Sequence, residues 1–310
     1  MKSDEQEVRT VAPVQLERGP LLADDTLTGT PWCERHSALI DAWLVSLFEP
    51  PGGGTEGVAL VAVGGYGRSE LCPQSDLDVM LLHAGRRDIA TIAERIWYPI
   101  WDTGMKLGHS VSTVREALTL ADSDLDSATA LLSARHIAGD ASLTDELESR
   151  ARRQWEQRSK RVLTDLANRV DARHAQAGEV AFMLEPDLKE GRGGLRDVHS
   201  LHWAQAARNV LFEHDDASLR GAYAVLLDAR VELHRRTRRP TNVLALQEQD
   251  GVAAALGARD ADALMGDIAA AARSIAWTSD DVASSAIVAA RPVGPSRAPR
   301  SRARRRIAPA

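Results

Sequence analysis

The most constraining feature of this sequence is a pair of short apolar runs separated by a glycine-containing turn. Residues 58–63 and 77–82 are rich in Val and Leu and are bounded by Gly, Pro, Ser and Asp, which is typical of buried strands. Gly64 and Gly65 directly follow the first run. Because glycine has no side chain, backbone N–H groups there can approach an anion such as a phosphate. The pattern predicts a sheet with an anion-binding turn.

Two carboxylates open the second run, at Asp76 and Asp78. Alternate residues of a strand share a face, so both carboxylates point one way while Leu77 points into the core. Mg²⁺ prefers oxygen ligands and binds through one or two carboxylates plus substrate phosphates. With the preceding glycines, the aspartates indicate nucleotidyl transfer assisted by metal ions. Taken singly, the glycines also suit an ordinary turn and the aspartates a solvated strand end.

The remaining periodicity is largely helical. Apolar spacing predicts an amphipathic helix over 34–48 and another over 88–104, followed by a short polar strand at 109–113. From Val114 onward the spacing is helical, interrupted by residues 184–197, which combine Pro and three glycines with seven charged side chains. The predicted fold class is α+β, with a sheet domain followed by an all-helical domain.

Composition and charge exclude several classes. With 44% hydrophobic and 26% charged residues the chain is globular, and its apolar runs fall far short of the ~20 residues of a membrane helix, so we expect a cytoplasmic protein with no membrane partner. The net charge is −6, although residues 291–310 hold seven Arg and no acid. This Pro- and Ser-rich tail predicts disorder rather than specific nucleic-acid binding. Cys33 and Cys72 have no spacing typical of a disulfide framework or a zinc site.

Residues 61–82, VAVGGYGRSELCPQSDLDVMLL, carry a resemblance to a known family. They resemble the nucleotidyltransferase fold of the DNA polymerase β superfamily and, more narrowly, the signature of bacterial PII uridylyltransferases. Residues 108–113 and 184–203 are similar to further blocks of that family. The sequence departs from the family at Ser69, where Gly is usual, and at Arg192, where Pro is usual.

The resemblance implies roles for particular residues. Asp76 and Asp78 would be catalytic and hold Mg²⁺. The residues that would contact the nucleotide are Gly64, Gly65, Arg68 and Ser69.

Two features of this site remain open in the sequence. A polymerase-β-type site usually has a third carboxylate on a later strand, but the candidate strand offers His109 and Ser110. Arg68 suits either phosphate neutralisation or an exposed salt bridge to Glu70 or Asp76.

The charged loop at 184–197 is predicted to make a second contact with the nucleotide or the protein substrate. Its glycines suggest a flexible backbone, and cations flank them. The cations concerned are Lys189, Arg192 and Arg196. The loop also suits an exposed interhelical connection.

Histidines suggest two further sites that we set aside. His214-Asp215 matches the dipeptide of HD phosphohydrolases, but that chemistry needs further His and Asp ligands. His199 and His202 share a helical face without a third ligand, so packing or solvated roles are favoured over metal binding.

The implied organisation is an N-terminal extension at 1–33, a nucleotidyltransferase domain at 34–140, a helical domain at 141–288 and a disordered basic tail at 289–310. The implied reaction attaches UMP from UTP to a tyrosine of the PII signalling protein and releases pyrophosphate. ATP is an alternative donor, because 34 Arg against four Lys indicates a GC-rich genome and family members from such genomes resemble adenylyltransferases. The sequence is also compatible with a catalytically impaired, truncated PII-binding remnant and with transfer to a small molecule.

Longer family members continue past the point corresponding to about residue 285. They carry an HD phosphohydrolase domain that removes the nucleotide and paired ACT domains that respond to glutamine. From this sequence we expect transfer in one direction only and no direct glutamine sensing.

Overall fold

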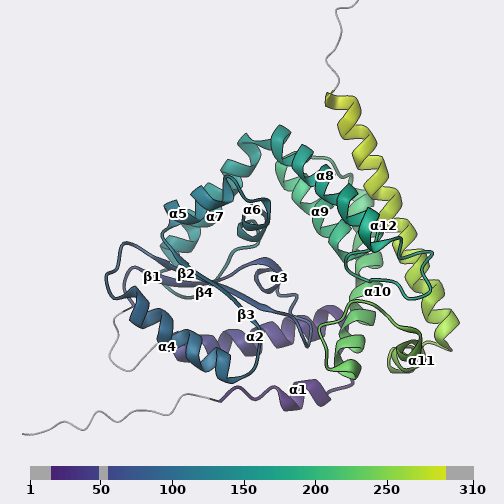
Figure 1. Cartoon of the computed structure of the whole chain (residues 1–310), viewed down its shortest axis with the longest axis horizontal. Coiled ribbons are helices and arrows are strands. Elements are labelled where there is room, and N and C mark those ends of the chain that lie inside the picture. Colours follow the sequence, from purple (N-terminus) through teal and green to yellow (C-terminus); the bar gives the residue numbers. More distant parts are fainter. Residues whose placement is uncertain (1–14, 49–54, 291–310) are drawn as a thin grey trace, which may run out of the picture.

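A four-stranded sheet and twelve helices make up the part of the chain that the computed structural model describes, residues 15–48 and 55–290, with side chains to residue 282 (Figure 1). The predicted α+β class with a helical C-terminal region is confirmed. The helices are α1 (Gly19–Ala23), α2 (Gly29–Phe48), α3 (Gly64–Gly67), α4 (Ile89–Asp102), α5 (Val114–Ala121), α6 (Leu125–Leu131), α7 (Ala141–Gln157), α8 (Ser159–Ala177), α9 (Leu195–Ala207), α10 (Glu213–Thr237), α11 (Leu246–Ala255) and α12 (Ala261–Ala290).

The sheet is mixed and has the strand order β3-β2-β1-β4. Central strand β1 (Val58–Ala62) runs antiparallel to both β2 (Leu77–His83) and β4 (Arg135–Gly139). Edge strand β3 (Leu107–Ser112) runs parallel to β2. All five residues of β1 are buried, as expected for a strand covered on both faces.

Helices cover both faces of this sheet (Figure 1). Leu60 and Leu81 belong to a core with α2 and α4, whereas their strand neighbours Val61 and Leu82 pack with α5 and α7. This alternation follows from the two-residue period of a strand. Asp78 and Leu82 are four residues apart on β2, so both lie on the face of the sheet that α5 and α7 cover. The opposite face is covered by α2 and α4.

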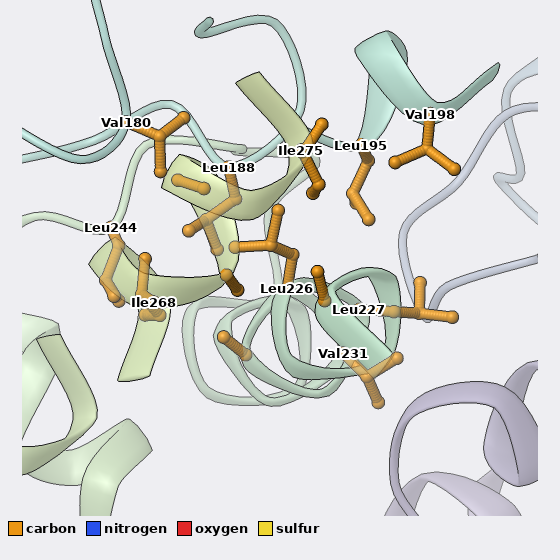
Figure 2. Packing of buried hydrophobic residues seen from close by; sticks show 14 of the residues in the cluster. Val180, Leu188, Leu195, Val198, Leu226, Leu227, Val231, Leu244, Ile268 and Ile275 are labelled. Atoms are coloured by element: carbon orange, nitrogen blue, oxygen red, sulfur yellow. The ribbon is translucent and has the colours of Figure 1, made fainter. Parts of the chain in front are cut away.

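The helical region has its own core, which lies around α10 (Figure 2). Leu226 and Val231 of α10 are fully buried, and Ile275 of α12 and Leu195 of α9 pack in the same cluster. Full burial of a side chain of this size contributes ~1.5–3 kcal/mol relative to exposure. The core therefore fixes α9, α10 and α12 against one another.

Helix α2 joins the two cores. Trp32 and Cys33, near its start, are buried in the helical core, while Ile40, Trp43 and Phe48 are buried against the sheet. One continuous helix thus holds the sheet and the helical region in a fixed relation. The fold therefore fixes the space between the sheet and the helical region.

Several sequence predictions need correction. The expectation that everything beyond Val114 is helical is wrong, because β4 pairs with β1 there. In β4 only Ala138 is buried, so the strand lacks a clear apolar alternation. The first long helix begins at Gly29 rather than residue 34, and β3 lies two residues earlier than predicted at its start.

Helix α12 continues to Ala290, so the first two residues of the predicted tail (289–310) lie in this helix, and the rest of the tail lies outside the described residues. The division into domains stays a prediction. Within the described ranges, no helix combines the length and the apolar character needed to cross a membrane.

Candidate active site

A cavity of about 490 Å³ lies between the sheet and the helical region. Residues contributed from the sheet side include Gly64, Gly65, Arg68, Asp76 and Asp78. Residues from the helical side include Lys189, Arg196, His199, Tyr223 and Arg230. The structure thus brings together five of the six residues predicted for the site. Ser69 is not part of the lining described.

The two aspartates form an acidic wall. Asp78 is the second residue of β2, and Asp76 lies just before the strand, with its Oδ2 2.7 Å from Lys106 Nζ. Burial and then the negative charge of Asp76 raise the pKa of Asp78, although nearby cations oppose this. A raised pKa means that this site disfavours the bare carboxylate, so a bound cation would relieve the cost.

Two glycines give Asp78 its space. Gly108 pairs with Asp78 in the parallel register of β2 and β3, and a Cβ at Gly108 would lie 2.2 Å from Asp78 Oδ1. Gly64 has a φ of +59°, which L side chains rarely adopt, and a Cβ there would lie 3.4 Å from Asp78 Oδ2. No side chain can therefore replace Gly108 without displacing the carboxylate. Sequence reasoning gave Gly108 no role.

Arg68 is held by an ion pair, one of the two roles that the sequence left open. Its Nε donates to Glu70 Oε2 at 2.7 Å. Its Nη2 lies 3.9 Å from where a Cβ at Gly65 would be, on the cavity side. The guanidinium is thus oriented by Glu70 and still presents an end to the cavity beside Gly65.

Glu70 also links the sheet side to the helical side. His199 Nε2 lies 3.2 Å from Glu70 Oε2 and 3.0 Å from the Tyr223 hydroxyl. Burial opposes charge on Glu70, but His199 and Arg68 outweigh it and lower the Glu70 pKa to about 2. Burial and Arg68 lower the His199 pKa to about 4, so a neutral His199 donates from Nε2 to the carboxylate.

The histidines set aside in the sequence occupy different surroundings. His199 is buried, as expected for a packing residue, and it also lines the cavity. His202 is half-exposed, and its Nε2 lies 3.8 Å from Asp216 Oδ1. His214 is largely exposed beside Asp215. Among the residues that the structure describes, no three His, Cys, Asp or Glu side chains are arranged to hold a metal ion.

A basic wall faces the aspartates. It is formed by Lys189, Arg196 and Arg230. Arg230 donates from Nε to Asn242 Oδ1 and from Nη1 to Cys72 Sγ, both at 2.9 Å, and within the described ranges it forms no ion pair. Lys189 and Arg196 share one carboxylate, Glu190, at 3.9 and 3.3 Å, so the wall keeps an excess of positive charge, which attracts anions. Sequence reasoning found Lys189 and Arg196 but missed Arg230.

The charged loop before α9 differs from its predicted form. It lacks regular secondary structure up to Gly194, as expected, but its glycines are packed rather than flexible. Gly193, at φ +82°, leaves no room for a Cβ, which would lie 2.4 Å from the carbonyl oxygen of Ala272. Arg192 pairs with Glu179 and Asp280 and is not in the cavity lining. Of the three predicted cations, Lys189 and Arg196 reach the site.

Ser69, which stands where the resembled family usually has Gly, adopts an unfavourable backbone conformation. Its φ is +58°, in the left-handed region that glycine adopts freely. Serine at this position carries backbone strain that the usual Gly would not. Ser69 stays a predicted nucleotide contact that lies beside the described lining.

The third carboxylate remains unassigned. Asp126 of α6 also lines the cavity, but its Oδ2 is paired with Arg169 at 3.2 Å. The two candidate positions on β3, His109 and Ser110, are exposed on the sheet edge. Glu70 also lines the cavity but is held by Arg68 and His199, so the described part of the site offers Asp76 and Asp78 as its two candidate metal ligands.

Lys189 gives the cavity a pH dependence. Burial first, then the charges of Arg230 and Arg196, lower the Lys189 pKa to about 8. Lysine is cationic below its pKa, so we expect affinity for inorganic triphosphate, measured by calorimetry, to fall as pH rises through about 8. Lys189→Arg keeps its charge at these pH values. A Lys189→Arg variant with the same pH slope as the wild type would exclude Lys189 as the source.

Sequence comparisons with known proteins identify relatives of this chain. Residues 149–282 match the family model described as GlnD PII-uridylyltransferase. A bifunctional uridylyltransferase/uridylyl-removing enzyme of Streptomyces coelicolor is 46% identical over 84% of this chain and 31% of its own length. Enzymes of the same name from Mycobacterium tuberculosis and Corynebacterium glutamicum are 44% and 36% identical over 79% and 78% of this chain.

These matches first define a class, since the relatives are named as enzymes that transfer and remove a nucleotidyl group. More narrowly, over the region matched, the chain belongs to the PII-uridylyltransferase family. The resemblance read from the sequence is therefore confirmed. The chain spans about a third of the length of these relatives, as its 31% coverage of the first two shows.

Proposed function

We propose that this chain attaches UMP from UTP to a tyrosine hydroxyl of a PII-type signalling protein and releases pyrophosphate. The observation that carries the proposal is the pairing of opposite walls in one cavity, Asp76 and Asp78 on one side and Lys189, Arg196 and Arg230 on the other. Carboxylates suit a cation, and three basic side chains that share a single carboxylate, Glu190, suit the phosphates that the cation accompanies. The names of the relatives supply the uridylyl group, and the description of the family model supplies the PII acceptor.

The acidic wall fits Mg²⁺. Asp76 and Asp78 supply two hard oxygen donors; burial first, and then the charge of Asp76, raise the pKa of Asp78, and a bound cation would offset both costs. Mg²⁺ keeps several waters and completes its shell with substrate phosphates, so a third carboxylate is not required. When bound between these aspartates, Mg²⁺ supplies positive charge that offsets the charge developing on the reacting phosphate.

The chain's own groups then define the reaction geometry. Gly64 and Gly65 let the backbone approach the phosphates, and Arg68, oriented by Glu70, adds a cation beside them. The basic wall takes the two outer phosphates. The acceptor hydroxyl loses its proton to solvent, and its oxygen attacks the inner phosphate from the side opposite the pyrophosphate. The bond between the inner phosphate and the pyrophosphate breaks, and fixed cations stabilise the charge that grows on the leaving group.

ATP is the second donor we propose, because the described lining of the cavity favours neither base. Among the residues that the structure describes, no third carboxylate joins Asp76 and Asp78, which instead favours a PII-binding remnant that lacks activity. These possibilities differ in what the chain binds and what it releases, so one assay separates them.

The test is a transfer assay. The purified chain is incubated with Mg²⁺, PII, and UTP or ATP labelled at the inner phosphate, and label on PII is measured by gel and by intact mass. We expect a mass increase of one UMP with UTP. A mass increase of one AMP, seen with ATP and not with UTP, would show that ATP rather than UTP is the donor. Binding of PII without label from either nucleotide would contradict the proposal in favour of the remnant.

Gly65→Asp is expected to weaken nucleotide binding at least tenfold. A Cβ at Gly65 meets nothing closer than Arg68 Nη2 at 3.9 Å, so the new side chain fits and acts through its charge beside Arg68. A carboxylate at ~4 Å from a phosphate charge costs roughly 1–4 kcal/mol, depending on the local dielectric. Calorimetry with UTP measures the effect.

Gly65→Ala is the matched control, since it adds the Cβ without the charge. It should bind UTP more tightly than the Asp variant. Equal loss in both variants would show that close backbone approach, rather than charge, determines binding. Unchanged affinity in both would remove Gly65 from the phosphate site.

A further inference from the structure

The only two cysteines of the sequence lie side by side in the fold. Cys33 comes from α2 and Cys72 from the segment between α3 and β2, and both are fully buried. Their Sγ atoms are 3.8 Å apart, and both thiols are free. The two sulfurs are therefore in contact without being bonded.

The surroundings make the two thiols unequal. Arg230 Nη1 donates to Cys72 Sγ at 2.9 Å, whereas the contact described for the Cys33 sulfur is Cys72 itself. The hydrogen bond from Cys33 and the charge of Arg230 lower the pKa of Cys72, whereas that contact and burial raise the pKa of Cys33. Cys72 is therefore the reactive member of the pair, because the thiolate is the nucleophile.

The reactive sulfur lies just behind the cavity wall. Arg230 lines the cavity and touches Cys72 with the same guanidinium group. A small oxidant in the cavity is thus separated from the Cys72 sulfur by one side chain. Structural buried cysteines usually lack such a cation and are inert.

We infer that Cys33 and Cys72 form a reversible oxidative modification site, which hydrogen peroxide converts to a disulfide. The Cys72 thiolate attacks one peroxide oxygen, so an S–O bond forms, the O–O bond breaks and hydroxide leaves. Cys33 sulfur then attacks Cys72 sulfur, and the S–O bond breaks with release of water that takes up the thiol proton. The two sulfurs together lose two electrons. The hydroxide from the first step takes up the proton that Cys72 released on ionising, so the peroxide is reduced to two waters.

Closing this bond would disturb the cavity. An S–S bond is ~2.05 Å long, so the sulfurs must approach by roughly 1.8 Å from their present separation. Cys72 begins a turn in which its carbonyl accepts from the Ser75 N–H and its N–H donates to Ser75 Oγ, both at 3.0 Å. Asp76 follows this turn directly. Oxidation also removes the thiolate partner of Arg230, so both walls are affected.

The test uses hydrogen peroxide on the full chain, followed by thiol titration under denaturing conditions and intact mass spectrometry. We expect both free thiols to disappear together with the mass of two hydrogens, and a thiol reductant to restore them. A peptide joining Cys33 to Cys72 identifies the bond. Two thiols that survive the peroxide, or a disulfide between two chains, would overturn the inference.

The Cys33→Ser variant tests the roles of the two sulfurs separately. In Cys33→Ser the disulfide cannot form, so peroxide should leave a Cys72 sulfenic acid that dimedone traps. Absence of the adduct in folded Cys33→Ser would contradict the assignment of Cys72 as the attacking sulfur. If Cys33→Ser does not fold, the linked peptide from the wild-type chain still decides whether the bond forms.

The effect on the cavity rests on the proposed function. We expect peroxide to lower the affinity for UTP at least fivefold in the wild type, with recovery on reduction, and to cause a smaller loss in Cys33→Ser, where the thiolate is oxidised but no S–S bond moves the turn at Cys72. A disulfide that leaves affinity unchanged would overturn this coupling while leaving the modification site intact. Absence of UTP binding before oxidation would count against the proposed function, not against the disulfide.

Discussion

Replacement of Asp78 by Asn is expected to reduce nucleotidyl transfer by ~10²–10³, the loss typical of a removed electrostatic contact to the transition state. Asn keeps the shape of Asp but not its charge, so the acidic wall would hold a cation less tightly. Asp76→Asn should act in the same direction. The fold should survive, since Asp76 is 41% exposed and Asp78 lies on the cavity wall.

The stability of Asp78→Asn separates a binding role from a structural one. Burial and the charge of Asp76 raise the Asp78 pKa, so at neutral pH the folded state carries a cost for the ionised group. A neutral Asn removes that cost, and the melting temperature should be unchanged or higher without metal. Asp165→Asn, which breaks an exposed pair with Arg161, is a charge-matched control that should keep activity. Near-wild-type transfer by Asp78→Asn would show that the cation site is misassigned.

The features that could be predicted from the sequence are those that depend on local sequence patterns. The strands around Gly64, Gly65 and Asp78 follow from composition and alternation within a few residues, and the structure places them as expected. Strand β4 was missed because its sequence has one buried residue and its identity depends on pairing with β1. A strand of this kind is defined by its partner rather than by its own pattern.

Arg230 of the basic wall could not be predicted for the same reason, because its role depends on residues distant in the sequence. Arg230 touches Cys72, which is 158 positions away in the sequence. In the sequence Arg230 is one charge among many on a long helix, whose cations are usually solvated. Only the packing of α10 against α2 and α9 turns its side chain toward the cavity. Gly108 is similar, because its requirement for glycine comes from Asp78 on the neighbouring strand.

Asp197→Ala is expected to lower the free energy of unfolding by ~3–5 kcal/mol, the cost of leaving a buried charge without its partner. The Asp197 side chain is fully buried and pairs with Arg173, whose side chain is 11% exposed. Asp197 Oδ1 lies 2.9 Å from His174 Nε2, and Oδ2 accepts from the Gly193 N–H at 2.7 Å. Burial opposes its charge, but His174 and Arg173 outweigh this and lower the Asp197 pKa. Its contribution is therefore present at neutral pH and is lost as pH falls through the lowered pKa.

Asp197→Ala should also weaken UTP binding at the active site, because Asp197 fixes the loop that carries Lys189. Urea unfolding measures the stability, and calorimetry with UTP measures the binding. Glu146→Gln is the matched control: its pair with Arg150 is an exposed contact four residues apart on α7, with side chains 47% and 46% exposed. Such pairs contribute ~0.3–0.5 kcal/mol, so this variant should unfold close to the wild type. If Asp197→Ala and Glu146→Gln lost similar stability, the buried carboxylate would not anchor the loop, and Lys189 would have to be held in the cavity by the backbone hydrogen bonds of the loop alone.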